Sequence, residues 1–243
     1  GNAFPGEDPS LALMPYWREG RRLIGRSTVT ECDLLPISNG DQRGPLPVDA
    51  QGRCTSIAVG TYANDHHYPG EDWPLAQKSV RWGGRWSGTP FCIPFDALIS
   101  ESIPNLVMAE KGFSVSHMAN GATRLQPLIL NLGQVAGLAA AMAVRQGCAV
   151  GDLAVDAIQS ALIHEPQAPA AVLPIWDWPL WHPHWVTAQE QGLARPEHLD
   201  AKGCLSGPRA STLIPPGVNQ APNQPNEVGL SGVLTGNLQE GYQ

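Results

Sequence analysis

The chain has 243 residues, and glycine and proline together supply about a fifth of them, which predicts much irregular backbone. A hydrophobic content of 42% with eight Trp excludes general disorder, because the chain has enough apolar surface to offset the entropy of folding. A formal net charge of −7 excludes nucleic-acid binding through the neutralisation of phosphates.

An arginine-rich segment follows the proline-containing first 15 residues. It carries Arg18, Arg21, Arg22 and Arg26. Arg18 and Arg22 lie on the same face whether the segment forms a strand or a helix. Two guanidinium groups on one face suit the binding of a carboxylate or another oxygen-rich substrate. The alternative is that these arginines form surface ion pairs with Glu19 or Asp33.

Two histidines lie in a long loop that follows a predicted strand. Residues 55–62 (TSIAVGTY) are rich in β-branched and aromatic residues, which predicts the strand. The loop over residues 63–90 contains His66 and His67. A loop of this length inside a domain is usually functional or shielding. Further short strands are expected at residues 91–95 and 106–109.

The strongest local pattern predicts a helix from Pro127 to Arg145. Proline suits the first turn of a helix and Gly147 suits its end. The segment is apolar on nearly every side, so we expect it to be buried all round. Its apolar run is too short and too polar for a membrane span, because Asn131 and Gln134 interrupt it. A second helix is expected at residues 155–164.

The C-terminal part has a different composition. Residues 166–185 are rich in Trp and Pro and are predicted to wrap the main domain, whereas residues 204–243 are predicted to be a loop-rich tail. An alternative is that Trp176, Trp178 and Trp181 form a sugar-stacking platform, as in a non-catalytic carbohydrate-binding module.

Five cysteines occur without the spacing of a metal site or a disulfide framework. We therefore expect free thiols and no metal. Free thiols favour a reducing compartment such as the cytoplasm.

Residues 114–126 (SVSHMANGATRLQ) lie between a predicted strand and the predicted helix. The start of a helix presents free N–H groups and the positive end of its dipole, which favour an anion or a developing negative charge. Gly121 and Ala122 are small enough for a ligand to approach the backbone. Potential donors around the same point are His117, Thr123, Arg124 and Gln126. His117 has an equal alternative as a core histidine bonded to a backbone carbonyl.

The stretch NLVMAEKGFSVSHMANGATRLQPLILNLGQVAGLAAA resembles the last FAD-binding segment of the FAD-dependent oxidoreductase family, which has a glutathione-reductase-like flavin fold. Three earlier stretches resemble the same family in order: YWREGRRLIGRSTVTECDL, IAVGTYANDHHYPG and PFCIPFDALI. Together the four stretches cover roughly residues 15–165.

The resemblance implies an α/β fold, FAD as cofactor, and hydride transfer from an oxygen-rich small-molecule substrate to the flavin. It places Glu110 and Lys111 near the ribityl chain, and His117 is counted with them as a candidate cofactor-binding residue because it lies near the same helix start. It places Gly121, Ala122, Thr123, Arg124, Leu125 and Gln126 beside the pyrimidine edge of the flavin. His66 and His67 would act as acid or base on a substrate hydroxyl, with Arg18 and Arg22 as the other candidate catalytic residues.

One family feature is missing: no G-x-G-x-x-G follows a predicted strand, and the adjacent pair Gly83 and Gly84 is flanked by Trp82 and Arg85. We therefore expect the C-terminal portion of an FAD-binding domain, partnered by a missing N-terminal half. The expected parts are a mostly β substrate-capping region (1–100), the C-terminal FAD segment (101–165), and a wrapping segment with a tail (166–243). The alternatives are an inactive flavoenzyme fragment and the carbohydrate-binding module.

Overall fold

The computed structural model describes residues 18–34, 44–62, 90–175 and 179–194. Several sequence predictions fall outside these ranges: those for His66, His67, Trp176 and Trp178, the Gly83-Gly84 pair, and the tail at 204–243.

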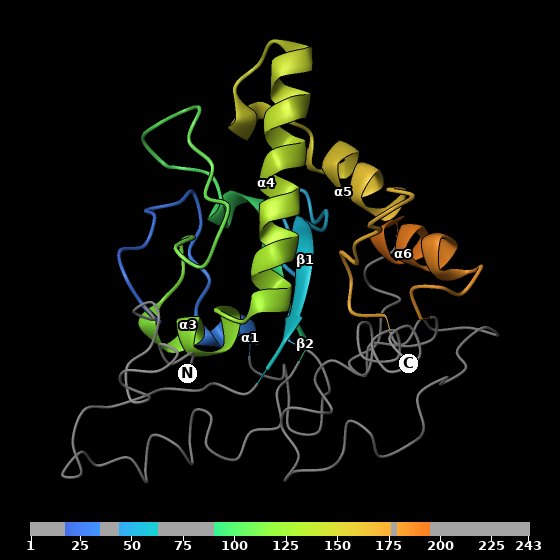
Figure 1. Ribbon diagram of the computed structural model, residues 1–243, viewed down its shortest axis with the longest axis horizontal. Coiled ribbons are helices and arrows are strands. Elements are labelled where there is room, and N and C mark those ends of the chain that lie inside the picture. The colour runs from blue at the N-terminus through green and yellow to red at the C-terminus, as the bar shows by residue number, and fades with distance from the viewer. Residues whose placement is uncertain (1–17, 35–43, 63–89, 176–178, 195–243) are drawn as a thin grey trace, which may run out of the picture.

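The described residues form a mixed fold of helices and a small sheet (Figure 1). In chain order the elements are α1 (Glu31–Leu34), β1 (Ser56–Thr61), β2 (Pro90–Pro94), η1 (Phe95–Ala97), α3 (His117–Thr123), α4 (Gln126–Gln146), η2 (Val150–Asp152), α5 (Val155–Ile163) and α6 (Trp185–Ala194). The predicted strands at 55–62 and 91–95 and both predicted helices are confirmed to within about a residue at each end. The mixture of helix and strand agrees with the expected α/β class.

β1 and β2 pair in antiparallel fashion, with Val59 opposite Cys92. Gly60 lies opposite Phe91 in this register. A Cβ atom at Gly60 would lie 2.5 Å from the Phe91 ring and 3.0 Å from the Leu128 side chain of α4. Glycine at this position therefore lets the helix and the phenyl ring pack closely against the strand.

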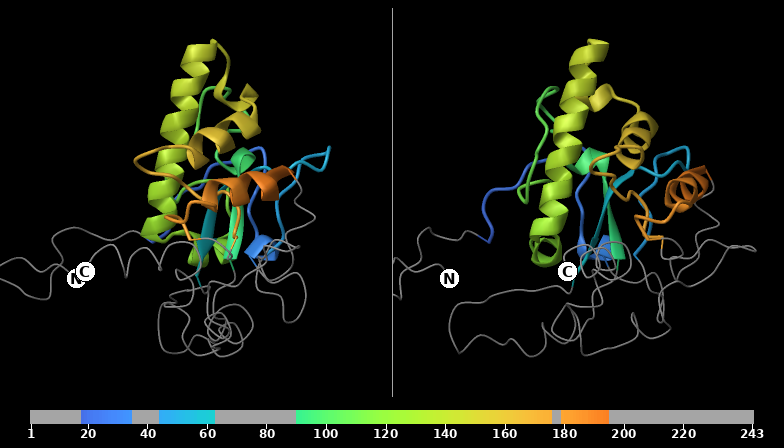
Figure 2. Two further views of the ribbon diagram at one scale, coloured as in Figure 1. Left: turned by 90° about the vertical axis from the view of Figure 1, so that its right-hand side faces the viewer. Right: turned by 45° about the vertical axis from the view of Figure 1, so that its right-hand side comes forward.

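The sheet lies between α4 on one side and α5 and α6 on the other (Figures 1 and 2). Leu132, Val135 and Ala139 recur every three or four residues along α4 and are fully buried. They share one hydrophobic core with Ile57 of β1 and Phe91 of β2. Burying a leucine side chain contributes roughly 1.5–3 kcal/mol, so this face fixes α4 on the sheet.

The opposite face of α4 is exposed, and the prediction of a helix buried all round is wrong. Leu130 is 76% exposed and Val144 is 82% exposed. A Cβ atom at Gly137 would meet nothing within 4 Å. The reason is geometric: among the described residues, the sheet, η2 and α5 pack along α4 from one side, and an apolar composition does not by itself supply a second layer.

In the described part of the chain, α4 is long and apolar enough to cross a membrane by length and composition alone, with a mean hydropathy of 1.6 over an 18-residue window. The core helix of a soluble protein passes the same test, and 39% of this window is buried. The helix is therefore weak evidence for a membrane span.

The arginine-rich segment forms neither a helix nor a regular strand, so both predicted alternatives for it are wrong. Its backbone is instead held by the chain that precedes α3. The Leu23 N–H donates to the Gly112 carbonyl at 2.7 Å, and the Val29 N–H donates to the Ser114 carbonyl at 3.0 Å. These bonds use the polar groups of irregular backbone that a sheet would otherwise satisfy. They bring two segments distant in sequence side by side.

The strand expected at residues 106–109 is reduced to a single bridge, in which Val107 pairs with Ile99. The Leu106 carbonyl accepts from the Ser100 N–H at 3.1 Å and the Met108 N–H donates to the Leu98 carbonyl at 2.8 Å, and residues 104 and 105 before them form a turn. The strand expected to lead into the candidate site is thus a loop with one ladder contact.

The C-terminal described segment folds into α6, a helix that the sequence did not predict, and α6 packs against α5. Trp185 is 1% exposed and belongs to the core, whereas Trp181 is half exposed. The packing role expected of this region is therefore confirmed for Trp185. The four cysteines among the described residues form no disulfide, as expected: Cys32, Cys54, Cys92 and Cys148.

Candidate functional site

The segment predicted to hold a ligand folds as a short helix followed directly by a long one. α3 begins after Ser116, whose hydroxyl accepts a hydrogen bond from the Ala119 N–H at 3.1 Å. This is an N-cap contact, which stabilises a helix start. We expected a loop here. The serine at Ser116 was the available signal for a helix, but Asn120 and Gly121 in the same stretch disfavour one.

The start of α4 carries no side-chain cap. Leu125 occupies the N-cap position without a side-chain hydrogen bond to the first turn, and Pro127 lies in that turn. An α-helix leaves its first N–H groups without partners inside the helix, and its dipole makes this end positive. The α3–α4 junction, Arg124 and Leu125, is therefore a place that favours a negatively charged group of a ligand.

Two buried polar atoms of α3 lack hydrogen-bond partners among the described residues: Asn120 Oδ1 and Thr123 Oγ1. The Asn120 amide itself donates to the Lys111 carbonyl at 3.3 Å. A buried polar atom without a partner costs free energy, so native proteins seldom leave one without a reason. Both atoms lie within the last four residues of α3, immediately before the junction. A ligand with hydrogen-bonding groups at the junction would supply partners for them.

Arg124 brings a buried positive charge to this junction. The residue is 8% exposed, and its Nη1 lies 4.0 Å from Oε2 of Glu19. Burying a guanidinium is costly unless anions or acceptors surround it. The Glu19 carboxylate supplies part of that compensation from the arginine-rich segment.

Glu19 also contacts two more of the candidate residues. Its Oε1 accepts a hydrogen bond from Arg22 Nη1 at 3.1 Å and lies 2.9 Å from Nδ1 of His117. The structure thus joins Arg22 from the predicted substrate side with His117 and Arg124 from the predicted cofactor side. The sequence left open that an arginine of this segment pairs with Glu19, and Arg22 does so. This ion pair lies within the candidate site.

The remaining candidate residues differ in how exposed they are. His117 is exposed, so its reading as a core histidine is wrong. Glu110 is exposed and Lys111 is half-buried, in a turn where the Phe113 N–H donates to the Glu110 carbonyl at 3.2 Å. Arg18 is exposed and precedes Glu19. Gly121, Ala122 and Thr123 are buried, Leu125 is half-buried and Gln126 is exposed. His66 and His67 lie outside the described residues.

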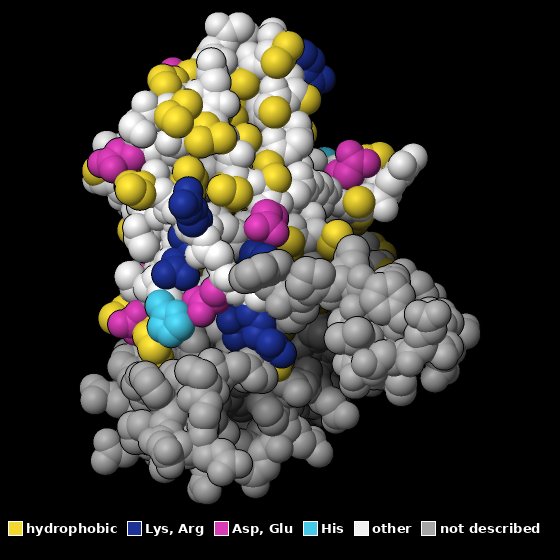
Figure 3. Space-filling view, turned by 60° about the vertical axis from the view of Figure 1, so that its left-hand side comes forward, with side chains coloured by type: hydrophobic (Ala, Val, Ile, Leu, Met, Phe, Trp, Pro, Cys, Tyr) yellow, Lys and Arg dark blue, Asp and Glu magenta, His cyan; other side chains and the backbone are white. Residues whose placement is uncertain are grey.

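One face of the molecule carries side chains of both charges (Figure 3). In Figure 3, Lys and Arg, acidic and His side chains gather in the lower half of the face, above the grey residues. The upper half carries mainly hydrophobic side chains and backbone. Glu19 itself contacts Arg22, His117 and Arg124, so the candidate site also combines both signs of charge, which suits a polar substrate better than an apolar one.

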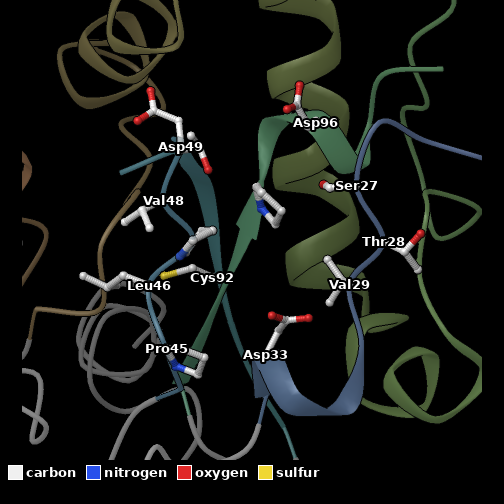
Figure 4. Close-up of a pocket in the computed structure, with 13 residues that line it drawn as sticks. Ser27, Thr28, Val29, Asp33, Pro45, Leu46, Val48, Asp49, Cys92 and Asp96 are labelled. Atoms are coloured by element: carbon white, nitrogen blue, oxygen red, sulfur yellow. The ribbon is translucent and has the colours of Figure 1, made fainter. Parts of the chain in front are cut away.

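A separate cavity of about 340 Å³ has a different character (Figure 4). Asp33, Asp49 and Asp96 line it, together with apolar side chains. Asp33 Oδ2 accepts a hydrogen bond from the Thr30 N–H at 2.7 Å. The pKa of Asp49 is lowered, mainly by a hydrogen bond from the Arg53 N–H. The acidic lining disfavours a negatively charged ligand, and no described candidate residue lines this cavity.

Comparison with known proteins supports the resemblance noted from the sequence. A family model described as "FAD dependent oxidoreductase" matches residues 4–162, which is nearly two thirds of the chain. Searches of the curated proteins and of the solved structures returned no match. The match includes the arginine-rich segment, the sheet, the α3–α4 junction and α5 up to residue 162, and its extent establishes family membership.

Proposed function

The chain belongs to the FAD-dependent oxidoreductase family, FAD is its cofactor, and from this premise we propose that the α3–α4 junction holds the flavin ring. The observation that carries this proposal is the combination at one point of an uncapped helix start, the buried Arg124, and the unpartnered polar atoms of Asn120 and Thr123. These groups fit the pyrimidine edge of a flavin, which carries several hydrogen-bonding atoms and gains negative charge on reduction.

When FAD is bound, it supplies a two-electron acceptor that no amino-acid side chain provides. The residues of the chain supply binding and charge stabilisation. Arg124 and the positive end of α4 stabilise negative charge at the junction without reorganising, because they are already fixed by the fold. Gly121 and Ala122 have no side chain beyond Cβ, which favours the close approach of a flat ring to the backbone.

Substrate binding is proposed for the side that faces the arginine-rich segment. Arg22 and His117 share the Glu19 carboxylate, and Arg18 lies next to it in sequence. Guanidinium groups in this position orient an oxygen-rich substrate through charge-assisted hydrogen bonds. The proposed reaction moves a hydride from a substrate C–H to FAD, while His66 or His67 accepts the proton of the adjacent hydroxyl.

The proposed functional regions follow one another along the chain. Residues 1–100 are proposed as the substrate-capping region, residues 101–165 as the C-terminal part of the FAD-binding domain, and residues 166–243 as a wrapping segment followed by a loop-rich tail. Support comes from the placement of Glu19 and Arg22 against the residues around α3, and from the packing of α6. The adenosine diphosphate half of FAD needs binding groups in addition to those of the α3–α4 junction.

The first test is an absorption spectrum of the purified chain after incubation with excess FAD and removal of unbound cofactor. Weak retained bands near about 370 and 450 nm, where oxidised flavins absorb, are the expected result, because the junction binds only part of FAD. A colourless protein contradicts the proposal that this chain alone holds FAD.

A matched pair of variants tests whether the flavin binds at the α3–α4 junction. Gly121→Leu fills the backbone approach at the junction and is expected to abolish the retained bands. Gly137→Leu adds the same side chain to the exposed face of α4, where nothing lies within 4 Å, and is expected to keep them. Retention of flavin by both folded variants, checked by circular dichroism, excludes the junction as the flavin site.

A further inference from the structure

We propose that Glu19 is a positioning residue that holds Arg22 and Arg124 on the two sides of the site and offsets part of their positive charge. This inference rests on the proposed function and deepens it. It assigns a role to a carboxylate that the sequence pattern indicated only as a possible surface partner of arginine.

The contacts of Glu19 come from both parts of the chain that the proposed function brings together. One carboxylate oxygen, Oε1, is shared by Arg22 at 3.1 Å and His117 at 2.9 Å. The other, Oε2, faces Arg124 at 4.0 Å. Arg22 is three residues away in sequence, whereas His117 is 98 residues away. The two oxygens therefore connect the proposed substrate side to the proposed cofactor side.

Burial distinguishes this network from an ordinary surface ion pair. The Glu19 side chain is 25% exposed and the Arg124 side chain is 6% exposed. Exposed pairs contribute little because water screens them. A buried guanidinium loses much of its hydration, so a nearby carboxylate matters more to it than to an arginine in solvent.

The backbone next to Glu19 is fixed well enough to hold a side chain in place. The Leu23 N–H donates to the Gly112 carbonyl at 2.7 Å. A Cβ atom at Gly112 would lie 3.2 Å from the Arg21 carbonyl oxygen, so glycine permits this close contact between the two segments. Glu19 is thus two residues from a segment docked onto the chain that leads into α3, and its carboxylate is presented to the junction by that docking.

The charge balance gives the proposal a measurable consequence. With Glu19 present, one negative charge lies between two guanidinium groups. Without it, the site is more positive by one charge, and Arg22 and Arg124 repel each other. Reduced FAD carries more negative charge than oxidised FAD, so a more positive site favours the reduced cofactor.

The test is the midpoint reduction potential of FAD bound to the wild-type chain and to Glu19→Gln, which removes the charge and keeps the shape. The potential is expected to shift to more positive values in Glu19→Gln and to return toward the wild-type value in Glu19→Asp. Arg22→Gln, which removes a positive charge, is expected to shift the potential in the opposite direction. The double variant Glu19→Gln/Arg22→Gln is expected to lie near the wild type.

A matched control is Glu31→Gln, because the Glu31 carboxylate accepts a hydrogen bond from the Ser116 hydroxyl at 3.2 Å at the start of the same helix α3. Its potential is expected to shift less than that of Glu19→Gln. A purely structural role for Glu19 would lower the melting temperature and leave the potential at the wild-type value, and that result overturns the inference. If Glu19→Gln fails to fold, the Glu19→Asp and Arg22→Gln variants decide, and wild-type potentials in both reject it.

Failure of the proposed function gives a different result. A wild-type chain that retains no FAD at the junction rejects the proposed function and with it the role of Glu19. A wild-type chain that retains FAD, with unshifted potentials in the Glu19 and Arg22 variants, rejects the role of Glu19 alone.

Discussion

The body of the molecule and the α3–α4 junction are stabilised in opposite ways. In the body, β1, β2 and the sheet-facing side of α4 meet through apolar side chains such as Ile57, Phe91 and Leu132. At the junction, the contacts are between charged or polar groups, with Glu19 bound to Arg22 and close to Arg124. The contrast teaches that the apolar core and the candidate site draw on different residues, although α4 belongs to both regions.

The difference has a physical basis. Apolar burial contributes free energy to folding in proportion to area and needs no ligand. Buried charges and unpartnered polar atoms reduce stability unless something binds them. The junction keeps two such groups, the Thr123 hydroxyl and the Arg124 guanidinium, and under the proposed function bound FAD offsets their cost.

The largest expected effect is on the free energy of unfolding, through a change in the apolar body. Leu132→Ala removes a fully buried side chain of α4 and is expected to lower the free energy of unfolding by about 2–5 kcal/mol. Leu130→Ala makes the same chemical change on the exposed face, and its effect is expected to stay within about 0.5 kcal/mol. Urea unfolding of both variants measures the difference. Equal losses would contradict the one-sided burial of α4.

The next effect is on the junction. Arg124→Ala removes the buried guanidinium and is expected to weaken FAD binding about tenfold to a hundredfold, the range for a hydrogen bond to a charged group. Arg53→Ala, whose guanidinium pairs with Asp49 at 2.8 Å on the surface, is the control and is expected to bind FAD like the wild type. Titration of flavin fluorescence gives both dissociation constants. Equal affinities in the two variants would remove Arg124 from the flavin site.

A smaller change separates stability from binding at a single atom. Thr123→Val replaces an unpartnered hydroxyl with a methyl group of similar shape. It is expected to stabilise the FAD-free protein by about 1 kcal/mol and to weaken FAD binding several-fold. Thr28→Val is the counterpart, because its hydroxyl bonds Ser114 Oγ at 2.9 Å and its loss is expected to destabilise. Thermal unfolding checks the opposite signs. A destabilised Thr123→Val would show that this hydroxyl is already satisfied.

The smallest effect is the pH dependence of the turn at Asp49. Hydrogen bonds from the Arg53 and Gln51 backbone lower the pKa of Asp49 below its ordinary value of 3.8. Its stabilising contribution is therefore present above pH 3.8 and is lost as the pH falls through the lowered pKa. The melting temperatures of the wild type and Asp49→Asn are expected to differ near neutral pH and to converge in acid. A constant difference would mean that the ionised carboxylate does not stabilise the turn.

Much of the body could be predicted from the sequence, because its signals are local. Pro127 and Gly147 mark the ends of α4, and Gly147 takes the left-handed conformation with φ of 66° that such an end requires. The exposure of Leu130 could not be predicted in this way, because a helix pattern shows which residues are apolar and not which neighbours cover them.

The junction could be predicted only in part. The types of its residues were visible, since Arg124 and His117 stand before a strong helix start. The role of Glu19 was not, because its partners His117 and Arg124 lie about a hundred residues away and no local pattern joins them. α3 was missed because its residues are poor helix formers, and burial together with the Ser116 cap stabilises it.

One amide in the body protects the sheet from other chains. The Thr55 carbonyl accepts from the Phe95 N–H on the β2 side, so the carbonyls of Cys54 and Ser56 point to the other edge of the strand. The buried Gln159 Nε2 donates to both of these carbonyls, at 2.9 and 2.8 Å. A strand edge with unpaired carbonyls is a template for aggregation. By filling two of these acceptors, Gln159 blocks that end of β1 from pairing with a neighbouring molecule.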